Sequence, residues 1–395
     1  MNLLSSFTRS FKSFNAPKLN FRSRQHEPIR RAILTGVWTL FFLLLLDFSI
    51  NSLFSYPTDA SAHPRSQLQV YFEYGRSIEG KLSRLLGPTN QQSAAIAQSG
   101  WLDQKRWQQA SLPTRPEPGD NLLMAVYGMS FSEHVAKEVE ALDPTITIRA
   151  IGAPSAPPNH SYTAYLLDRN VHQADIVVLG ILASSVKGLR TLNGMTWQFE
   201  SPAPYSYPRY RLEAGKLKAT VPKVDTLAEL RTAFDDPTLW NDYIQQLQAD
   251  DQFYDWFLFR HNFFDRSAIA RMMRRGFAQR HQEKLENEVY TKTKGFNSEV
   301  DIPVLQAIAT EFAARVRADG KLPVLLLIND SGYADHLYQA LKPTLESNSI
   351  QFVSTHTIAP VTDATNFISD GHFTKTANRR IGQAMLSLIN QHYDR

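Results

Sequence analysis

Three residues near opposite ends of the main part of this chain could together carry out acyl chemistry: Ser130, Asp370 and His372. A serine hydroxyl is a poor nucleophile unless an imidazole takes its proton, and the imidazole needs a carboxylate to hold its tautomer. His372 would be the base and Asp370 the orienting acid. These residue types predict a serine nucleophile, provided that the fold brings the three side chains together.

The residues around Ser130 predict a strand, a tight turn and a helix. The apolar run 122–127 leads into Gly128-Met129-Ser130, and apolar residues then recur at helical spacing from Phe131. A serine at such a junction lies at the carboxyl edge of a sheet, where open α/β folds bind their ligands. Ser130 with Glu133 three residues later also has the pattern of a capping box. Both interpretations stay open, since a nucleophilic serine can also begin a helix.

The main part of the chain alternates between strand and helix patterns. Near-continuous apolar runs are typical of parallel strands covered on both faces. The alternation predicts an α/β fold, a three-layer sandwich with a five-stranded parallel sheet. The expected strands are 122–127, 145–151, 175–180, 322–328 and 350–354, and the expected helices are 131–142, 162–170, 304–318, 334–346 and 377–391. The carboxyl ends of these strands bring residues 128–130, 152–160, 180–185, 329–330 and the loop of Asp370 and His372 to one edge.

An insertion of about residues 190–300 interrupts the alternation. Its first part, up to Lys218, predicts a hairpin, and residues 226–287 predict helices. The aromatic run 253–259 and the arginines of 271–280 fit either packed helices with a solvated back or a face toward a membrane or a glycan.

The N-terminal region predicts a membrane anchor. Residues 1–31 carry seven basic residues against Glu27, a local charge of +6, and an apolar segment follows at 32–54, broken by Asp47. About 20 such residues span a bilayer, and the basic flank predicts a cytoplasmic N-terminus and an extracytoplasmic body. A cleaved signal peptide is the alternative, with a small-x-small motif at Ala60-Ser61-Ala62. Residues 55–118 are expected to form a linker and a helix over 68–86 before the main domain at 119–395.

Composition excludes several classes of function. The formal charge of +4 belongs to the tail, which leaves the rest of the chain at about −2, so the basic pI does not indicate a nucleic-acid binder. The absence of cysteine excludes disulfides and thiolate chemistry. His160, His356 and His372 are not at recurring ligand spacings, so neither a metal nor another cofactor is expected.

The motifs at the sheet edge resemble those of the SGNH or GDSL hydrolases. Gly128-Met129-Ser130 is similar to the Gly-Asp-Ser block of that family, Gly152 to the glycine after its second strand, and Asp370-Gly371-His372 to the acid and histidine before its last helix. The resemblance covers residues 121–395 and implies a flavodoxin-like SGNH fold with an ester-cleaving serine.

The chain departs from that family at three points. Met129 replaces the aspartate, Gly180-Ile181-Leu182-Ala183 lacks the asparagine of the oxyanion hole, and one residue rather than two separates Asp370 from His372. Backbone N–H groups of Ser130 and Gly152 are the expected oxyanion donors. Asn159 or Ser184 is the candidate to replace the missing amide, and Asp330 is the alternative orienting acid.

An anchored, outward-facing protein with this order of motifs also resembles the divergent SGNH-like proteins of bacterial envelope polymer modification. That resemblance implies a serine esterase or O-acyltransferase that acts on an acylated saccharide, with a membrane-bound O-acyltransferase as partner. The alternative is a catalytically inactive ectodomain that binds glycan or scaffolds such a transferase.

Overall fold

The computed structural model describes residues 26–57, 64, 66–87, 95–119, 121–297 and 299–394. Most of the basic tail and the Ala60-Ser61-Ala62 motif lie outside these residues. The chain forms two compact units, residues 1–53 and 54–395. In the first unit, helix α1 (His26–Leu53) is long and apolar enough over Pro28–Leu53 to cross a membrane. Asn51 donates to the Asp47 carboxylate at 3.2 Å, one turn away, which gives that polar side chain a partner within the helix.

The second unit is built on a five-stranded sheet in the order β2-β1-β3-β8-β9. All four neighbouring pairs are parallel. The strands are β1 (Leu122–Gly128), β2 (Ile146–Gly152), β3 (Ile176–Leu182), β8 (Leu322–Ile328) and β9 (Gln351–Ser354). This order is that of a flavodoxin-like doubly wound sheet, so the fold class expected from the sequence is confirmed.

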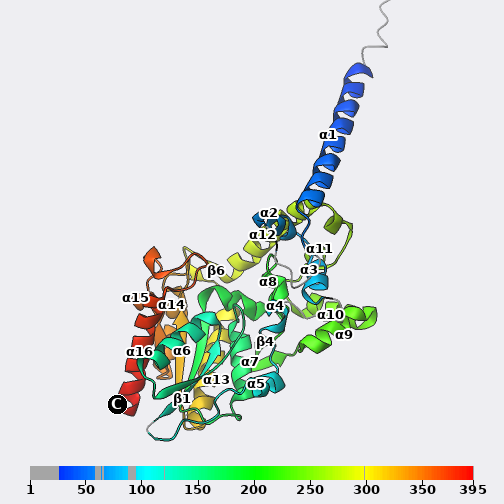
Figure 1. Ribbon diagram of the computed structural model, residues 1–395. Coiled ribbons are helices and arrows are strands. Elements are labelled where there is room, and N and C mark those ends of the chain that lie inside the picture. Colours follow the sequence, from blue (N-terminus) through cyan, green and yellow to red (C-terminus); the bar gives the residue numbers. More distant parts are fainter. Residues whose placement is uncertain are drawn as a thin grey trace, which may run out of the picture. The chain divides into compact units, whose positions relative to one another are not determined.

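Helices cover both faces of the sheet, which makes three layers (Figure 1). Along β1, Met124 and Val126 join the apolar core under one helical layer, while Leu123, Ala125 and Tyr127 join the core under the other. This alternation follows from the two-residue period of a strand. The first layer contains α6 (Ser130–Leu142) and α16 (Lys375–Tyr393), and the second contains α7 (Pro158–Asp168), α13 (Asp301–Ala318) and α14 (His336–Ser347).

The insertion is mostly helical, as expected. It begins after the 3₁₀ helix η1 (Ala183–Arg190), and its first part contains the antiparallel hairpin β4–β5. Its elements are α8 (Gly194–Trp197), β4 (Arg209–Glu213), β5 (Lys216–Thr220), α9 (Leu227–Asp235), α10 (Pro237–Asp250), α11 (Trp256–Phe259), η2 (Phe263–Arg266) and α12 (Ala268–Val289). The short pair β6 (Tyr290–Thr291) and β7 (Gly295–Phe296) then leads back to α13.

The prediction of a single helix over residues 68–86 is wrong. The structure has two helices there, α2 (Gln67–Glu73) and α3 (Ile78–Leu85). Ser77 ends the continuity, because its Oγ caps α3 through Gly80 N and also donates to the buried Asp265 carboxylate at 2.7 Å. This tertiary contact with η2 is absent from the local pattern. Two further short helices follow, α4 (Ala95–Gln98) and α5 (Gln104–Gln109).

A buried histidine makes the stability of the fold depend on pH. His160 on α7 is fully buried and is hydrogen-bonded through Nε2 to Gly100 O at 2.7 Å, and burial lowers its pKa from 6.5 to about 4. The unfolded chain therefore binds this proton first, and stability is lost as the pH falls from 6.5 toward 4. We expect the unfolding free energy to fall by about 3 kcal/mol between pH 6.5 and pH 4 because of His160.

Chemical denaturation of the full chain in micelles at pH 7 and pH 4 tests this expectation. His160→Gln keeps a donor for Gly100 O but does not titrate, so its loss of stability between the two pH values should be smaller by about 3 kcal/mol. Equal losses in the variant and the wild type would contradict the assignment.

Candidate active site

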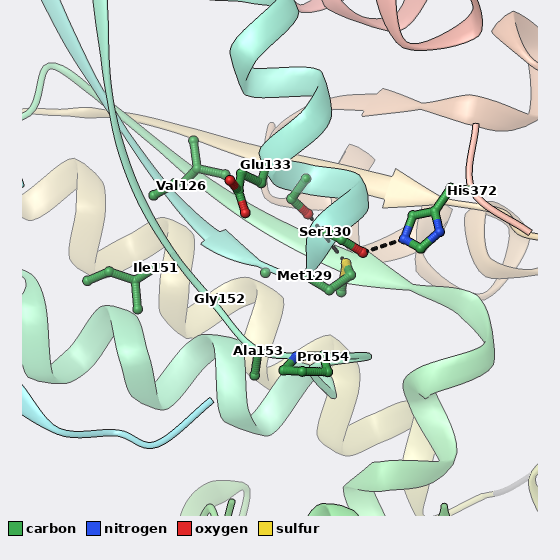
Figure 2. A pocket seen from close by; sticks show the side chains of 12 residues that line it. Val126, Met129, Ser130, Glu133, Ile151, Gly152, Ala153, Pro154 and His372 are labelled. Atoms are coloured by element: carbon green, nitrogen blue, oxygen red, sulfur yellow. Dashed lines mark hydrogen bonds between the residues drawn. The ribbon is translucent and has the colours of Figure 1, made fainter. Parts of the chain in front are cut away.

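Ser130 is the first residue of α6, directly after β1. The N-cap is Met129, which makes no side-chain capping bond. The capping box suggested by Ser130 and Glu133 is therefore absent, because the helix begins one residue earlier than that pattern requires. The serine hydroxyl is free for another partner, and Ser130 Oγ lies 2.6 Å from His372 Nε2. Figure 2 shows the two side chains pointing toward each other across the edge of the sheet.

A short loop between the 3₁₀ helix η3 (Ala364–Asn366) and α16 holds His372. Phe367 and Phe373 form an antiparallel bridge, and Ile368 N donates to His372 O at 2.8 Å. The turn between them contains Gly371 in the left-handed region, at φ +87°, which a side chain would strain. The His372 ring also stacks on Phe131, with centroids 4.7 Å apart. The backbone bridge fixes the position of the loop, and the stacking on Phe131 fixes the orientation of the imidazole ring.

Asp370, and not Asp330, is the carboxylate that the structure brings to His372. Asp370 Oδ1 lies 3.1 Å from His372 Nδ1 and also accepts the backbone N–H of His372 at 3.0 Å. The second bond, together with the neighbouring imidazole, lowers the pKa of Asp370. The turn at Gly371 lets the two side chains meet although one residue separates them. The Asp370 side chain is 61% exposed, so water screens this contact.

Asp330 follows β8 and has a different structural role. Its Oδ1 accepts the backbone N–H of Ser184 at 3.1 Å, which ties the end of β8 to the segment after β3. Burial raises the pKa of its carboxyl. No contact between Asp330 and His372 occurs among the described residues.

A cavity of about 340 Å³ lies beside the Ser130 hydroxyl. Its walls come from the ends of β1 and β2, the first turn of α6 and the histidine loop (Figure 2). The lining residues are Val126, Gly128, Met129, Ser130, Ser132, Glu133, Ala150, Ile151, Gly152, Ala153, Pro154 and His372. A mixed lining with a hydroxyl and an imidazole at one end suits a small acyl group bound next to the nucleophile.

Two of the expected oxyanion donors line this cavity and the other candidates do not. Ser130 and Gly152 are both in its wall, and Gly152 pairs with Gly128 at the ends of β2 and β1. Asn159 is buried in α7 and donates its amide to Pro208 O at 2.9 Å, so its side chain is used elsewhere. Ser184 does not line the cavity either, and its backbone N–H donates to Asp330 Oδ1. The expectation that Asn159 completes the oxyanion hole is therefore dropped.

The first turn of α6 supplies the remaining polar groups near the nucleophile. The first N–H groups of a helix have no intrahelical partner and carry partial positive charge. The 13-residue helix α6 has no side-chain cap at this end, and its first intrahelical bond runs from Glu133 N to Met129 O. These N–H groups can therefore stabilise an anion that develops beside Ser130.

Three residues of α6 near the site were not singled out as site residues from the sequence. Phe131 supports the imidazole, and the exposed His134 lies with its ring centroid 5.6 Å from that of His372. Ser132 is buried and lines the cavity, with Oγ 3.4 Å from Met129 Sδ. A Cβ at Gly180 would lie 1.9 Å from this Oγ, which explains why β3 carries a glycine there. Of the three, only His134 lies at helical spacing from Ser130, four residues later, and that spacing is the signal that could have identified it.

The similarity between this chain and known proteins is weak. No protein-family model and no curated protein matches the sequence. Among solved structures it is similar to a protein assigned to the G-D-S-L lipolytic family from Desulfitobacterium hafniense, with 9% identity, a TM-score of 0.31, and coverage of 68% of this chain and 99% of the other. A protein assigned as an acylhydrolase from Bacteroides fragilis has 8% identity, a TM-score of 0.38 and coverage of 74% and 98%.

An acetyl-xylooligosaccharide esterase mutant from Geobacillus is also similar, with 10% identity, a TM-score of 0.32, and coverage of 69% of this chain and 95% of the other. Identities this low leave the chemistry to be argued from the site itself.

Within the described residues, no group of three or more histidine, aspartate or glutamate side chains is placed to hold a metal ion.

The exposed position of Asp370 gives a graded prediction. Asp370→Asn should lower kcat/KM for an aryl acetate on the order of tenfold, less than for a buried triad acid, because water partly replaces the carboxylate. Asp330→Asn is the matched control and should change kcat/KM by less than about twofold, since the amide oxygen can still accept from Ser184 N. Steady-state kinetics of both variants decide between the two acids, and a larger loss in Asp330→Asn would reverse the assignment.

Proposed function

We propose that this protein is a membrane-anchored serine esterase or O-acyltransferase that acts on acyl esters of cell-envelope or extracellular polysaccharide. The observation that carries the proposal is the 2.6 Å contact between Ser130 Oγ and His372 Nε2. That distance is within hydrogen-bond reach, the first requirement for a general base to activate a nucleophile. Asp370 on the opposite ring nitrogen favours the tautomer in which Nε2 accepts the serine proton.

The reaction divides into two acyl transfers. Ser130 Oγ attacks the ester carbonyl carbon while its proton passes to His372 Nε2. The bond from the carbonyl carbon to the sugar oxygen then breaks, and His372 returns the proton to that oxygen. Water or a second sugar hydroxyl attacks the acyl-serine, gives its proton to His372, and regenerates the Ser130 hydroxyl. The N–H groups of Ser130 and Gly152 stabilise the carbonyl oxygen in both transfers.

The same contact weighs against the alternative of a catalytically inactive ectodomain. A silent glycan-binding or scaffolding protein has no need to hold a serine hydroxyl on an imidazole that is itself stacked and paired with a carboxylate. The arrangement therefore favours catalysis.

The membrane setting and the substrate class rest on the N-terminal segment. Residues 1–31, which include the first residues of α1, carry seven basic side chains, so the positive-inside rule supports a cytoplasmic N-terminus and an extracytoplasmic catalytic domain. Acylated saccharides are the esters that such a domain would meet in a cell envelope. A membrane-bound O-acyltransferase is the partner that would supply or use the acyl group.

Activity-based labelling tests the proposal. A fluorescent alkyl phosphonate should label the full chain in micelles, while Ser130→Ala should show no labelling and His372→Ala a strong reduction, because the base is needed to activate the hydroxyl. Release of acetate from an acetylated polysaccharide then tests the substrate class. Labelling that persists in Ser130→Ala would place the nucleophile elsewhere. Acetate release equal to that of a heat-treated sample would contradict the polysaccharide substrate.

A further inference from the structure

An exposed apolar surface lies on α2 and α12, on the side where the chain enters the second unit. It consists of Leu68, Tyr71, Met272, Met273 and Phe277, together with Phe263 of η2, and is called here the methionine–aromatic surface. Met273 is 70% and Phe263 72% exposed. On α12, residues 272, 273, 276 and 277 form an outward stripe of Met, Met, Gly and Phe without a polar side chain. Large contiguous apolar exposure of this kind marks an interaction site.

Aromatic contacts join the parts of this surface. Phe263 stacks on Phe264 at 4.2 Å, Phe264 lies 5.5 Å from Phe257, and Phe257 lies 5.6 Å from Phe277. On the other side of α12, the guanidinium of Arg275 lies over the Tyr71 ring at 4.8 Å. Ring contacts therefore join η2, α11 and α12, and the contact of Arg275 with Tyr71 joins α12 to α2.

The same surface is tied to the first residues after α1. The Phe54 ring, immediately after the last residue of that helix, lies 5.8 Å from Phe72, and Gln69 donates to Ser55 O at 2.8 Å. Phe72 in turn contacts Tyr71 at 5.5 Å. Only three short contacts thus separate Phe54 from α12. If α1 crosses a bilayer, this part of the second unit cannot lie far from the point where the chain leaves it.

Polar contacts join α12 to η2, to the start of α3 and to the insertion. Arg274 on α12 pairs with Asp265 at 2.5 Å, both side chains being fully buried, and Asp265 accepts from Ser77 at the start of α3. Arg275 pairs with Glu200 of the insertion at 2.7 Å. The exposed Arg266 and Arg280 add positive charge near the apolar stripe, which suits anionic phospholipid headgroups.

We propose that the methionine–aromatic surface inserts into the headgroup region of the bilayer that α1 crosses. An apolar face with flanking arginines is the composition that binds in this interfacial zone. A bilayer is favoured over a protein partner because Phe54, which directly follows the last residue of α1, is joined to this surface through Phe72 and Tyr71. The catalytic domain is then held at two places, at the anchor and at this surface, rather than tumbling freely on a linker.

Site-directed fluorescence tests the proposal on the full chain, which contains no native cysteine. Met272→Cys and Met273→Cys are each labelled with a polarity-sensitive fluorophore and reconstituted into vesicles of phosphatidylcholine and phosphatidylglycerol. Val221→Cys is the control, because Val221 is an apolar residue after the β4–β5 hairpin whose exposure of 59% lies between those of Met272 and Met273. We expect nitroxide-headgroup lipids to quench the probes at 272 and 273 at least about twofold more than the probe at 221, with a blue shift of their emission.

The outcomes separate the possible occupants. Quenching at 272 and 273 no greater than at 221 would overturn the proposal, and it is also the result expected if the surface binds only another protein, since the vesicles contain none. Flotation of every variant with the vesicles reports on α1 separately. Hydrolysis of a soluble aryl acetate by Met273→Cys should equal that of the wild type, so a failure of the esterase assignment is distinguishable from a failure of this surface.

Discussion

Ser130→Ala is expected to lower kcat for an aryl acetate by about 10⁴-fold, because the remaining cavity and oxyanion donors can only accelerate attack by water. His372→Ala should cause a loss of similar size, since an unassisted hydroxyl is a weak nucleophile. The double variant should be no slower than either single variant, because the two residues act as one unit. Initial rates of the purified full chain in micelles, with thermal melting to verify folding, measure these losses.

Ser132→Ala is the matched control for this prediction. Ser132 lies two residues later in the same helix and lines the same cavity, but its Oγ contacts Met129 Sδ instead of an imidazole. Its replacement should change kcat by less than about tenfold. Wild-type turnover by Ser130→Ala would contradict the nucleophile assignment and favour the inactive ectodomain.

The second large effect is expected at a buried ion pair between β2 and α7. Asp168 accepts two hydrogen bonds from Arg149, at 2.6 and 2.7 Å, and a third from the Tyr127 hydroxyl at 2.7 Å. Both charged side chains are almost fully buried. Asp168→Ala would leave the guanidinium without a counter-charge, and we expect a loss of about 3–5 kcal/mol in unfolding free energy.

The pair of Arg169 and Asp319 provides the comparison. It has a similar N–O distance of 2.6 Å, but its side chains are partly exposed, at 19% and 24%. Asp319→Ala should therefore cost less than about 1 kcal/mol. Denaturant unfolding of both variants in micelles measures the difference, and equal losses would show that burial does not set the strength of the inner pair.

The order of elements in the sheet domain could be predicted because local pattern determines it. The apolar runs that became β1, β3 and β8 are short and bounded by turn residues, and each is followed by helical spacing. Parallel strands covered on both faces need such continuous runs, so the fold class followed from periodicity alone. The split between α2 and α3 was not foreseen in this way, because Ser77 is held by a contact with Asp265, 188 residues away, in addition to its local capping bond with Gly80 N.

The sequence alone determined that a serine follows the first strand, that an aspartate and a histidine precede the last helix, and that an apolar segment of membrane-spanning length lies near the N-terminus. Only the tertiary structure decided how these residues are used. Whether Ser130 caps its helix or meets His372 depends on a shift of one residue in the helix start. The turn at Gly371 brings Asp370 to the histidine, whereas Asp330 is bonded to the backbone N–H of Ser184 instead. Contacts across such distances in the chain leave no periodic trace in the sequence, because they are set by how the elements pack.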